Sequence, residues 1–335
     1  MTTAETKKSL IWTDIDYEKE GKQVGYLHLP HSVTRSAYGT IAIPIAVIRN
    51  GDGPTFLLMA GNHGDEYEGQ IVATRLIREL QPKDIKGRVI ILPAANLPAA
   101  MDGARVSPID GGNLNRAFPG DAEGSPTFAI SHYIDTVLYT KADYHHDLHS
   151  GGSSLDYMAF CSARLGADEA QNAKAIEALQ VFGAPLSFVW AHSPDNRLAA
   201  SAAIRRGVVA LGGEFGGCGR VSVPNLKIVE RGVRNYMAHA GVLKGWTIQR
   251  NPTRMVELKG RDYYVYAPEP GLFEPFCELG DMVKAGQPCG QVHFVDNPAR
   301  EPIVTHFRRD GLLVCKRHQG RVERGDCVAH LATDR

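Results

Sequence analysis

The chain has 335 residues, of which 43% are hydrophobic and 22% are charged, as in an ordinary globular protein. This length favours a large domain plus a smaller one. Its 37 Lys and Arg residues equal its 37 Asp and Glu residues, so no net field attracts nucleic acid or an anionic membrane. No run reaches the roughly 18 apolar residues that would span a bilayer. We therefore expect neither a nucleic-acid partner nor a membrane partner.

The N-terminal stretch MTTAETKKSLIW lacks a long apolar core and a small-residue cleavage site, which predicts that there is no signal peptide. The six cysteines are scattered without a C-x-x-C pair, a pattern typical of reduced cytosolic thiols. We therefore expect a cytoplasmic protein; the alternative is a secreted protein that has lost its signal.

Strand-like and helix-like runs alternate from about residue 22 to 250, which predicts an α/β layer fold with a largely parallel or mixed sheet. In such folds, sites form beyond the carboxyl ends of the strands. The predicted strands are 24–30, 39–50, 54–61, 87–96, 142–150, 156–163, 187–193 and 207–216. The predicted helices are 68–80, 127–142, 169–183 and 225–243.

The first strand-to-helix turn that carries candidate functional residues is AGNHGDEYEG, residues 60–69. His63 and Glu66 are three positions apart, so on the first turn of a helix they project to the same side and can share a metal ion. The alternative is helix capping, in which Asp65 or Glu66 interacts with the helix dipole and His63 is incidental. The pair alone does not decide between these interpretations.

Two later segments carry polar groups in glycine-bounded loops or strand ends. Arg105, Asn115 and Arg116 lie in the loop that contains GGNLNRAFPG, where a guanidinium fork could bind a carboxylate. The alternative for a loop arginine is a surface charge. Glu214 ends the apolar run of GVVALGGEFGG, where a buried carboxylate is costly without a partner or a task.

The strand ADYHHDLHS ends with His149 at its carboxyl edge, where a third metal ligand would lie. Strand alternation puts His149 on the same face as Asp143, His145 and Asp147. For His145 and its neighbour His146 we predict solvated positions on a polar edge strand.

In this order, the motifs NHGDE, NLNRAF, DLHSGG and GGEFGG resemble those of the succinylglutamate desuccinylase and aspartoacylase family, within the zinc carboxypeptidase superfamily. The resemblance covers most of residues 25–335. It implies one zinc ion per chain and a carboxypeptidase-like mixed sheet flanked by helices. The residues it implies are His63, Glu66 and His149 as zinc ligands, Glu214 as general base, Asn115 and Arg116 as carboxylate anchors, and Arg105 at the scissile carbonyl or the substrate.

One position departs from the family pattern. The family commonly has an aspartate two residues before the Asn-Arg pair, where it orients a zinc-bound histidine, and here that position is Asn113. An amide can still accept the imidazole proton, but it raises the basicity of the ligand less. Asp110 or Asp147 could take this role, and the sequence does not choose between them.

After about residue 255 the chain has short strand-like pieces separated by Gly, Pro and Asp, which predicts a small all-β domain. This part resembles a barrel-sandwich hybrid of the biotinyl and lipoyl type without the Met-Lys pair that is modified there. The predicted domains are a catalytic one at 1–254 and a β-rich one at 255–335. In the family the latter narrows the active-site entrance, and Tyr263, Tyr264 and Phe273 are candidates to reach it.

The predicted activity is zinc-dependent hydrolysis of a small N-acyl amino acid, a linear amide, to a carboxylate and a free amino acid. Further similarity to the N-acetyl-L-2,4-diaminobutyrate deacetylases of ectoine breakdown favours that substrate. The site segments also hold Asp65, Glu68, Asp110 and Asp147 but few basic residues, which favours a neutral or cationic substrate side chain. The alternatives are a zinc carboxypeptidase that acts on short peptides and a non-catalytic sensor. A homo-oligomer is left open.

Overall fold

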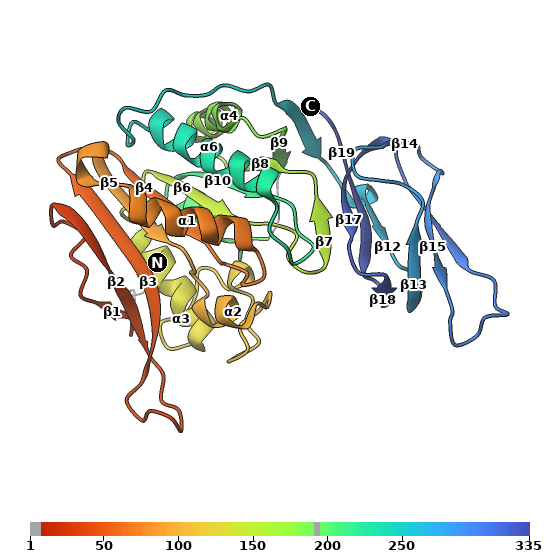
Figure 1. The fold of residues 1–335 in the computed structure, drawn as a ribbon, viewed down its shortest axis with the longest axis horizontal. Coiled ribbons are helices and arrows are strands. Elements are labelled where there is room, and N and C mark those ends of the chain that lie inside the picture. The colour runs from red at the N-terminus through yellow and green to blue at the C-terminus, as the bar shows by residue number, and fades with distance from the viewer. Residues whose placement is uncertain (1–7, 191–194) are drawn as a thin grey trace, which may run out of the picture.

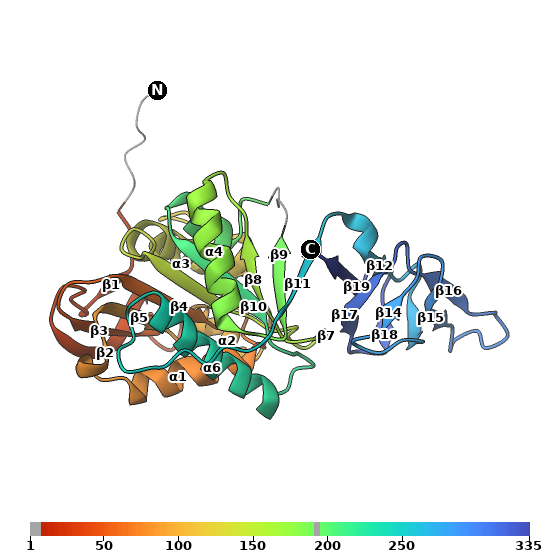
Figure 2. The same ribbon diagram turned by 90° about the horizontal axis from the view of Figure 1, so that it is seen from above.

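The computed structural model describes residues 8–190 and 195–335. A large mixed sheet runs through the described residues in the order β1-β2-β3-β5-β4-β6-β10-β8-β9-β11-β19-β17-β14 (Figures 1 and 2). Its first strands are β1 (Trp12–Thr13), β2 (Gly21–Pro30), β3 (Thr40–Asn50), β4 (Thr55–Ala60), β5 (Gly87–Leu92), β6 (Tyr144–Leu148), β7 (Leu155–Tyr157), β8 (Phe160–Arg164), β9 (Leu186–Trp190) and β10 (Val209–Glu214). The mixed α/β prediction is therefore confirmed.

Helices cover both faces of this sheet, and each face has its own apolar core. Helices α1, α4 and α6 pack on one face, and α3 and α5 pack on the other. The helices are α1 (Tyr67–Glu79), α2 (Leu97–Asp102), α3 (Pro126–Tyr133), α4 (Glu169–Phe182), α5 (Ala199–Arg205) and α6 (Val223–His239). Shorter helical turns are η1 (Pro82–Asp84), η2 (Leu114–Arg116), η3 (Ile134–Leu138) and η4 (Arg261–Tyr263).

The C-terminal part contributes to the large sheet and also forms a separate antiparallel sheet, in the order β16-β15-β13-β18. Its strands are β11 (Arg254–Leu258), β12 (Tyr264–Tyr266), β13 (Gly271–Pro275), β14 (Met282–Val283), β15 (Pro288–His293), β16 (Ile303–His306), β17 (Gly311–Arg317), β18 (Arg321–Val322) and β19 (Cys327–Asp334). Strand β11 joins the two parts, because it pairs with β9 on one side and with β19 on the other. The barrel-sandwich type and the boundary at residue 255 stay predictions.

Most predicted elements occur close to the predicted positions, with two informative differences. The helix predicted at 127–142 ends at Tyr133 and continues as the wider turn η3. Helix α5, with the sequence AASAAIR, was missed because its run of alanines has no apolar periodicity. The end of the strand predicted at 187–193 lies outside the described residues.

Register brings the ends of three strands to one edge of the sheet. Strand β6 is parallel to both β4 and β10, with Ala60 opposite Leu148 and Leu211 opposite His146. One step beyond β6, His149 bridges Glu214. The turn after β4, the end of β6 and the end of β10 therefore meet, as expected for the site-bearing edge of an α/β sheet.

Gly69 allows α1 to approach β6 closely, and we expect Gly69→Ala to destabilise the protein. A Cβ atom at this position would lie 2.5 Å from the Cβ of Leu148. Overpacking of this kind typically costs about 1–3 kcal/mol of unfolding free energy. Thermal unfolding should show a lower Tm, whereas Gly320→Ala, with no atom within 4 Å of the added Cβ, should leave the Tm unchanged. Equal Tm values for Gly69→Ala and wild type would contradict this packing argument.

Candidate active site

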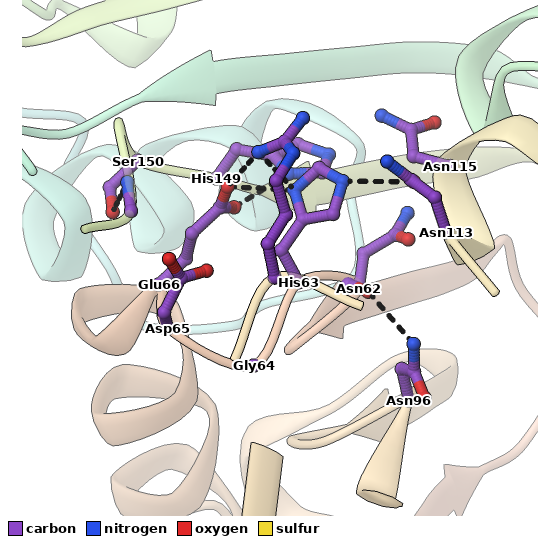
Figure 3. A network of polar contacts seen from close by, with 12 residues as sticks. Asn62, His63, Gly64, Asp65, Glu66, Asn96, Asn113, Asn115, His149 and Ser150 are labelled. Carbon is purple, nitrogen blue, oxygen red and sulfur yellow. Dashed lines mark hydrogen bonds and ion pairs between the residues drawn. The ribbon is translucent and has the colours of Figure 1, made fainter. Parts of the chain in front are cut away.

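Two histidines and one carboxylate converge at this edge of the sheet (Figure 3). His63 Nδ1 lies 2.7 Å from Glu66 Oε1, and His149 Nδ1 lies 2.8 Å from Glu66 Oε2. One ligand atom from each of the three residues lies within 4.8 Å of the others. His63 and Glu66 are buried, and His149 is nearly so. The structure thus places the three predicted zinc ligands together, and their role as ligands stays a prediction.

The charges in this cluster show that it favours a cation. Burial opposes ionisation of Glu66, but His63 and His149 outweigh that effect and hold the pKa of Glu66 well below its usual range. Burial likewise opposes protonation of His149, but Asp147 and Glu66 raise its pKa well above the ordinary value. Two imidazoles and a carboxylate suit zinc, which replaces the imidazole protons when it binds. The residues present therefore fit a zinc ion.

Each imidazole is oriented through its other ring nitrogen. His149 Nε2 lies 2.8 Å from Asp147 Oδ2, which also accepts a hydrogen bond from Asn62 Nδ2 at 2.9 Å. His63 Nε2 lies 3.2 Å from Asn113 Oδ1. Such contacts hold the ring angle and tune the basicity of the ligand. The sequence left open which residue orients the predicted zinc-binding histidines. In the structure Asn113 contacts His63, and Asp147 contacts His149.

The solvated-edge prediction for His145 and His146 is wrong. Strand β6 lies between β4 and β10 in the middle of the sheet, so both rings are fully buried. His145 Nδ1 lies 3.1 Å from the carbonyl oxygen of Leu57, and His146 Nε2 lies 3.3 Å from that of Gly212. Burial lowers the pKa of His146 to about 3, so this ring is a neutral part of the core.

Glu214 ends β10 beside the cluster. Its Oε2 atom is buried and has no hydrogen-bond partner among the described residues. Burial, together with the nearby Glu66 carboxylate, raises the pKa of Glu214 to about 8. A half-buried carboxylate whose inner oxygen has no structural partner suits a group that exchanges a proton with substrate or water.

The predicted loop residues gather around the same place. Arg105 Nη1 lies 3.4 Å from Glu66 Oε1, on a side chain that is 46% exposed. Asn115 Oδ1 accepts a hydrogen bond from the backbone N–H of Ala199 at 2.9 Å, which ties the loop to α5. Arg116 donates to the carbonyl oxygen of Asn115 at 2.7 Å, and its Nε lies 3.6 Å from Asp195 Oδ2. Arg105 thus reaches the His–Glu cluster, whereas the half-exposed Arg116 contacts only its loop and Asp195, at the rim of the site.

A cavity of about 80 Å³ opens next to His149 and Glu214. Besides residues predicted from the sequence, β8 and β9 line it with Phe160, Ser162, Arg164 and Trp190. These four were missed, although period-two alternation within β8 puts Phe160, Ser162 and Arg164 on one face. No motif surrounds these residues. They belong to the site because β8 pairs with β10, a strand that is distant in the sequence.

Of the four acidic residues counted near the site, three bind local backbone or hydroxyl groups instead of lining the cavity. Asp65 accepts hydrogen bonds from the backbone and hydroxyl of Ser153, and Glu68 accepts one from the backbone of Ser222. Asp110 binds Ser125 and Thr127 at the start of α3. Each therefore fixes a local backbone segment, and of the four only Asp147 lines the cavity.

Residues 52–240 match the model of the succinylglutamate desuccinylase/aspartoacylase catalytic domain. The chain belongs to this family. A curated relative is the N-alpha-acetyl-L-2,4-diaminobutyric acid deacetylase of Halomonas elongata, which is 38% identical over 327 residues, covering 97% of this chain and 96% of that protein. The protein is thus an amidohydrolase of the deacylase type, as the resemblance implied.

Solved structures of family members superpose over nearly the whole chain. A succinylglutamate desuccinylase/aspartoacylase from Rhodobacter sphaeroides is 41% identical, with a TM-score of 0.93 and coverage of 98% of this chain and 99% of that one. The product-bound ectoine utilization protein EutE (DoeB) from Ruegeria pomeroyi is 38% identical, with a TM-score of 0.94 and coverage of 98% and 100%. Within the described residues, no helix has the length and apolar character needed to cross a bilayer.

Proposed function

We propose that this family member is a zinc-dependent deacetylase of N-acetyl-L-2,4-diaminobutyrate, releasing acetate and the free amino acid. The observation that carries the proposal is the convergence of His63, Glu66 and His149 beside Glu214, whose Oε2 atom is buried without a partner among the described residues. The choice of substrate is supported by the name of the 38% identical relative, which covers nearly the whole chain.

His63, Glu66 and His149 would hold one zinc ion. When bound, zinc acidifies a water molecule and polarises the amide carbonyl. Glu214 takes a proton from the attacking water and delivers it to the leaving nitrogen as the C–N bond breaks. Arg105 donates hydrogen bonds to the carbonyl oxygen as charge develops there. Asn115 and Arg116, at the rim, contact the substrate carboxylate and hold the amide in place.

Two rivals use the same site differently. A carboxypeptidase would act on short peptides, but a cavity of about 80 Å³ suits a small side chain or head group better than an extended chain. A non-catalytic sensor would need the carboxylate anchors but no general base. The Glu214 carboxylate ends β10 beside the cluster with one buried oxygen that has no partner among the described residues, which favours an enzyme over a sensor.

Purified protein should release acetate and L-2,4-diaminobutyrate in equal amounts from the N-acetyl compound. We expect kcat/KM for this substrate to exceed that for N-acetyl-L-aspartate by about a hundredfold or more, because Asp147 and Glu214 line the cavity and would repel an additional carboxylate. A coupled assay of free amine measures both rates. Equal or faster hydrolysis of the aspartate derivative would overturn the choice of substrate, and preferential cleavage of dipeptides would support the carboxypeptidase.

A further inference from the structure

Arg164 lies at the far end of the cavity from Glu214. Strand β8 runs antiparallel to β10, with Phe160 opposite Glu214 and Ser162 opposite Gly212. Arg164 follows two residues later on the same face, about 13 Å of strand away from Phe160. Gly212, on the same face as Glu214, places no side chain in the space between Glu214 and Arg164, and a Cβ atom there would lie 3.3 Å from Ser162 Oγ. The cavity therefore has a carboxylate at one end and a guanidinium at the other.

The guanidinium of Arg164 makes no hydrogen bond or ion pair with a described residue, unlike the two loop arginines, although Asp195 lies near enough to favour its charge. Arg105 lies next to Glu66, and Arg116 lies next to Asp195. The contact recorded for the Arg164 guanidinium is with the ring of Trp190, at 5.1 Å from the ring centroid. Burial and the nearby charge of Arg116 lower the pKa of Arg164 to about 10, and the neighbouring Tyr264 and Asp195 offset only part of this shift. A half-buried guanidinium with no anion in direct contact is costly, so this site favours a ligand that supplies one.

A stack of rings from the C-terminal part holds Trp190 in place. His330 of β19 stacks on Trp190 with a centroid distance of 6.1 Å and an angle of 16°. Tyr264 of β12 also stacks on His330, with a centroid distance of 4.5 Å and an angle of 6°. Both ring nitrogens of His330 are buried without partners, and burial lowers the pKa of His330 to about 3, so this ring packs in its neutral form. The rings restrict Trp190 and thereby the guanidinium that lies over it.

We propose that Arg164 binds the α-carboxylate of the substrate and is a specificity-determining residue of this pocket. This inference rests on the proposed function, since it assumes an N-acyl amino acid. A guanidinium fork pairs with a carboxylate in bidentate geometry, whereas an acetyl methyl group or an ammonium would leave the Arg164 charge unpaired or repelled. With Arg116 at the rim, the carboxylate lies between two guanidinium groups, and the substrate ammonium points away from Arg164.

The test compares N-acetyl-L-2,4-diaminobutyrate with its α-carboxamide in wild type, Arg164→Gln and Arg164→Lys. Wild type should prefer the acid by about a hundredfold in kcat/KM, as expected for a charge pair that loses one partner. Arg164→Gln should lose most of this preference, chiefly through a higher KM for the acid. Arg164→Lys should recover part of it, because the charge returns without the planar fork.

Arg205→Gln is the matched control. Arg205 is an α5 arginine that donates to the carbonyl oxygen of Asn196 at 2.9 Å and does not line the cavity. Its loss should leave the preference for the acid intact. If Arg164→Gln folds, binds zinc and still prefers the acid to within about threefold of wild type, Arg164 does not bind the carboxylate. Should Arg164→Gln fail to fold, a wild-type preference in Arg164→Lys overturns the inference as well.

Calorimetric titration separates this inference from the proposed function. Wild type should bind L-2,4-diaminobutyrate more tightly than its carboxamide, and Arg164→Gln should bind the two alike. If wild type hydrolyses no N-acetyl amino acid, the proposed function fails, and the titration still tests the contact with Arg164. If Arg164→Gln prefers the acid over the carboxamide as strongly as wild type does, the role of Arg164 is overturned, and the proposed function is unaffected.

Discussion

Glu214→Gln is expected to lower kcat by about 10²–10⁴-fold, which corresponds to roughly 3–5 kcal/mol of activation free energy. Glutamine keeps the shape of the side chain but cannot accept the proton of the attacking water. Because one Glu214 oxygen is buried without a partner, the change should not weaken the fold, and it removes none of the three proposed zinc ligands. The measurement is kcat at saturating substrate, together with zinc content and Tm.

Glu68→Gln is a suitable control for Glu214→Gln. Glu68 is also a buried carboxylate near the site, but its Oε1 accepts a hydrogen bond from the backbone of Ser222, which a glutamine oxygen can accept equally. We therefore expect near-normal turnover from this variant. If Glu214→Gln works within about threefold of wild type, Glu214 is not the general base.

His149→Ala is expected to lose bound zinc and, with it, activity. The change removes one of three converging ligand atoms and leaves Asp147 buried without its imidazole partner. Two remaining ligands do not make up the three that a catalytic zinc usually takes from the protein. Metal analysis of dialysed protein should find about one zinc per chain in wild type and very little in His149→Ala.

His145→Ala tests the choice between neighbouring histidines. His145 faces Leu57 and Tyr139 in the core, so its loss should lower the Tm by creating a cavity but leave the zinc content unchanged. Loss of zinc in His145→Ala together with retention in His149→Ala would show that the ligand set is wrong.

Local patterns in the sequence were sufficient to predict much of this molecule. The period-two and period-3.6 runs predicted most strands and helices, because one buried face imposes its spacing on each element. The turn with His63 and Glu66 and the strand ends with His149 and Glu214 were found because parallel strands deliver their carboxyl ends to one edge. The family motifs then specified which polar residues at that edge belong together.

The order of the strands in the sheet could not be predicted from local sequence patterns, and the wrong predictions result from this. His145 and His146 look polar in sequence, yet β6 lies between β4 and β10 and buries both. Arg164 carries no motif, and it enters the cavity only because β8 pairs with β10. A tally of acidic residues near the motifs was misleading, because backbone N–H groups elsewhere already bind Asp65 and Glu68.

Zinc titration of metal-stripped protein, with bound zinc and deacetylation of N-acetyl-L-2,4-diaminobutyrate measured on the same samples, tests the proposed activity most directly. We expect zinc binding and activity to rise together and to saturate at one zinc per chain. Full activity of the stripped protein, or zinc that binds in equimolar amount without restoring hydrolysis, would contradict a zinc-dependent deacetylase built on His63, Glu66 and His149.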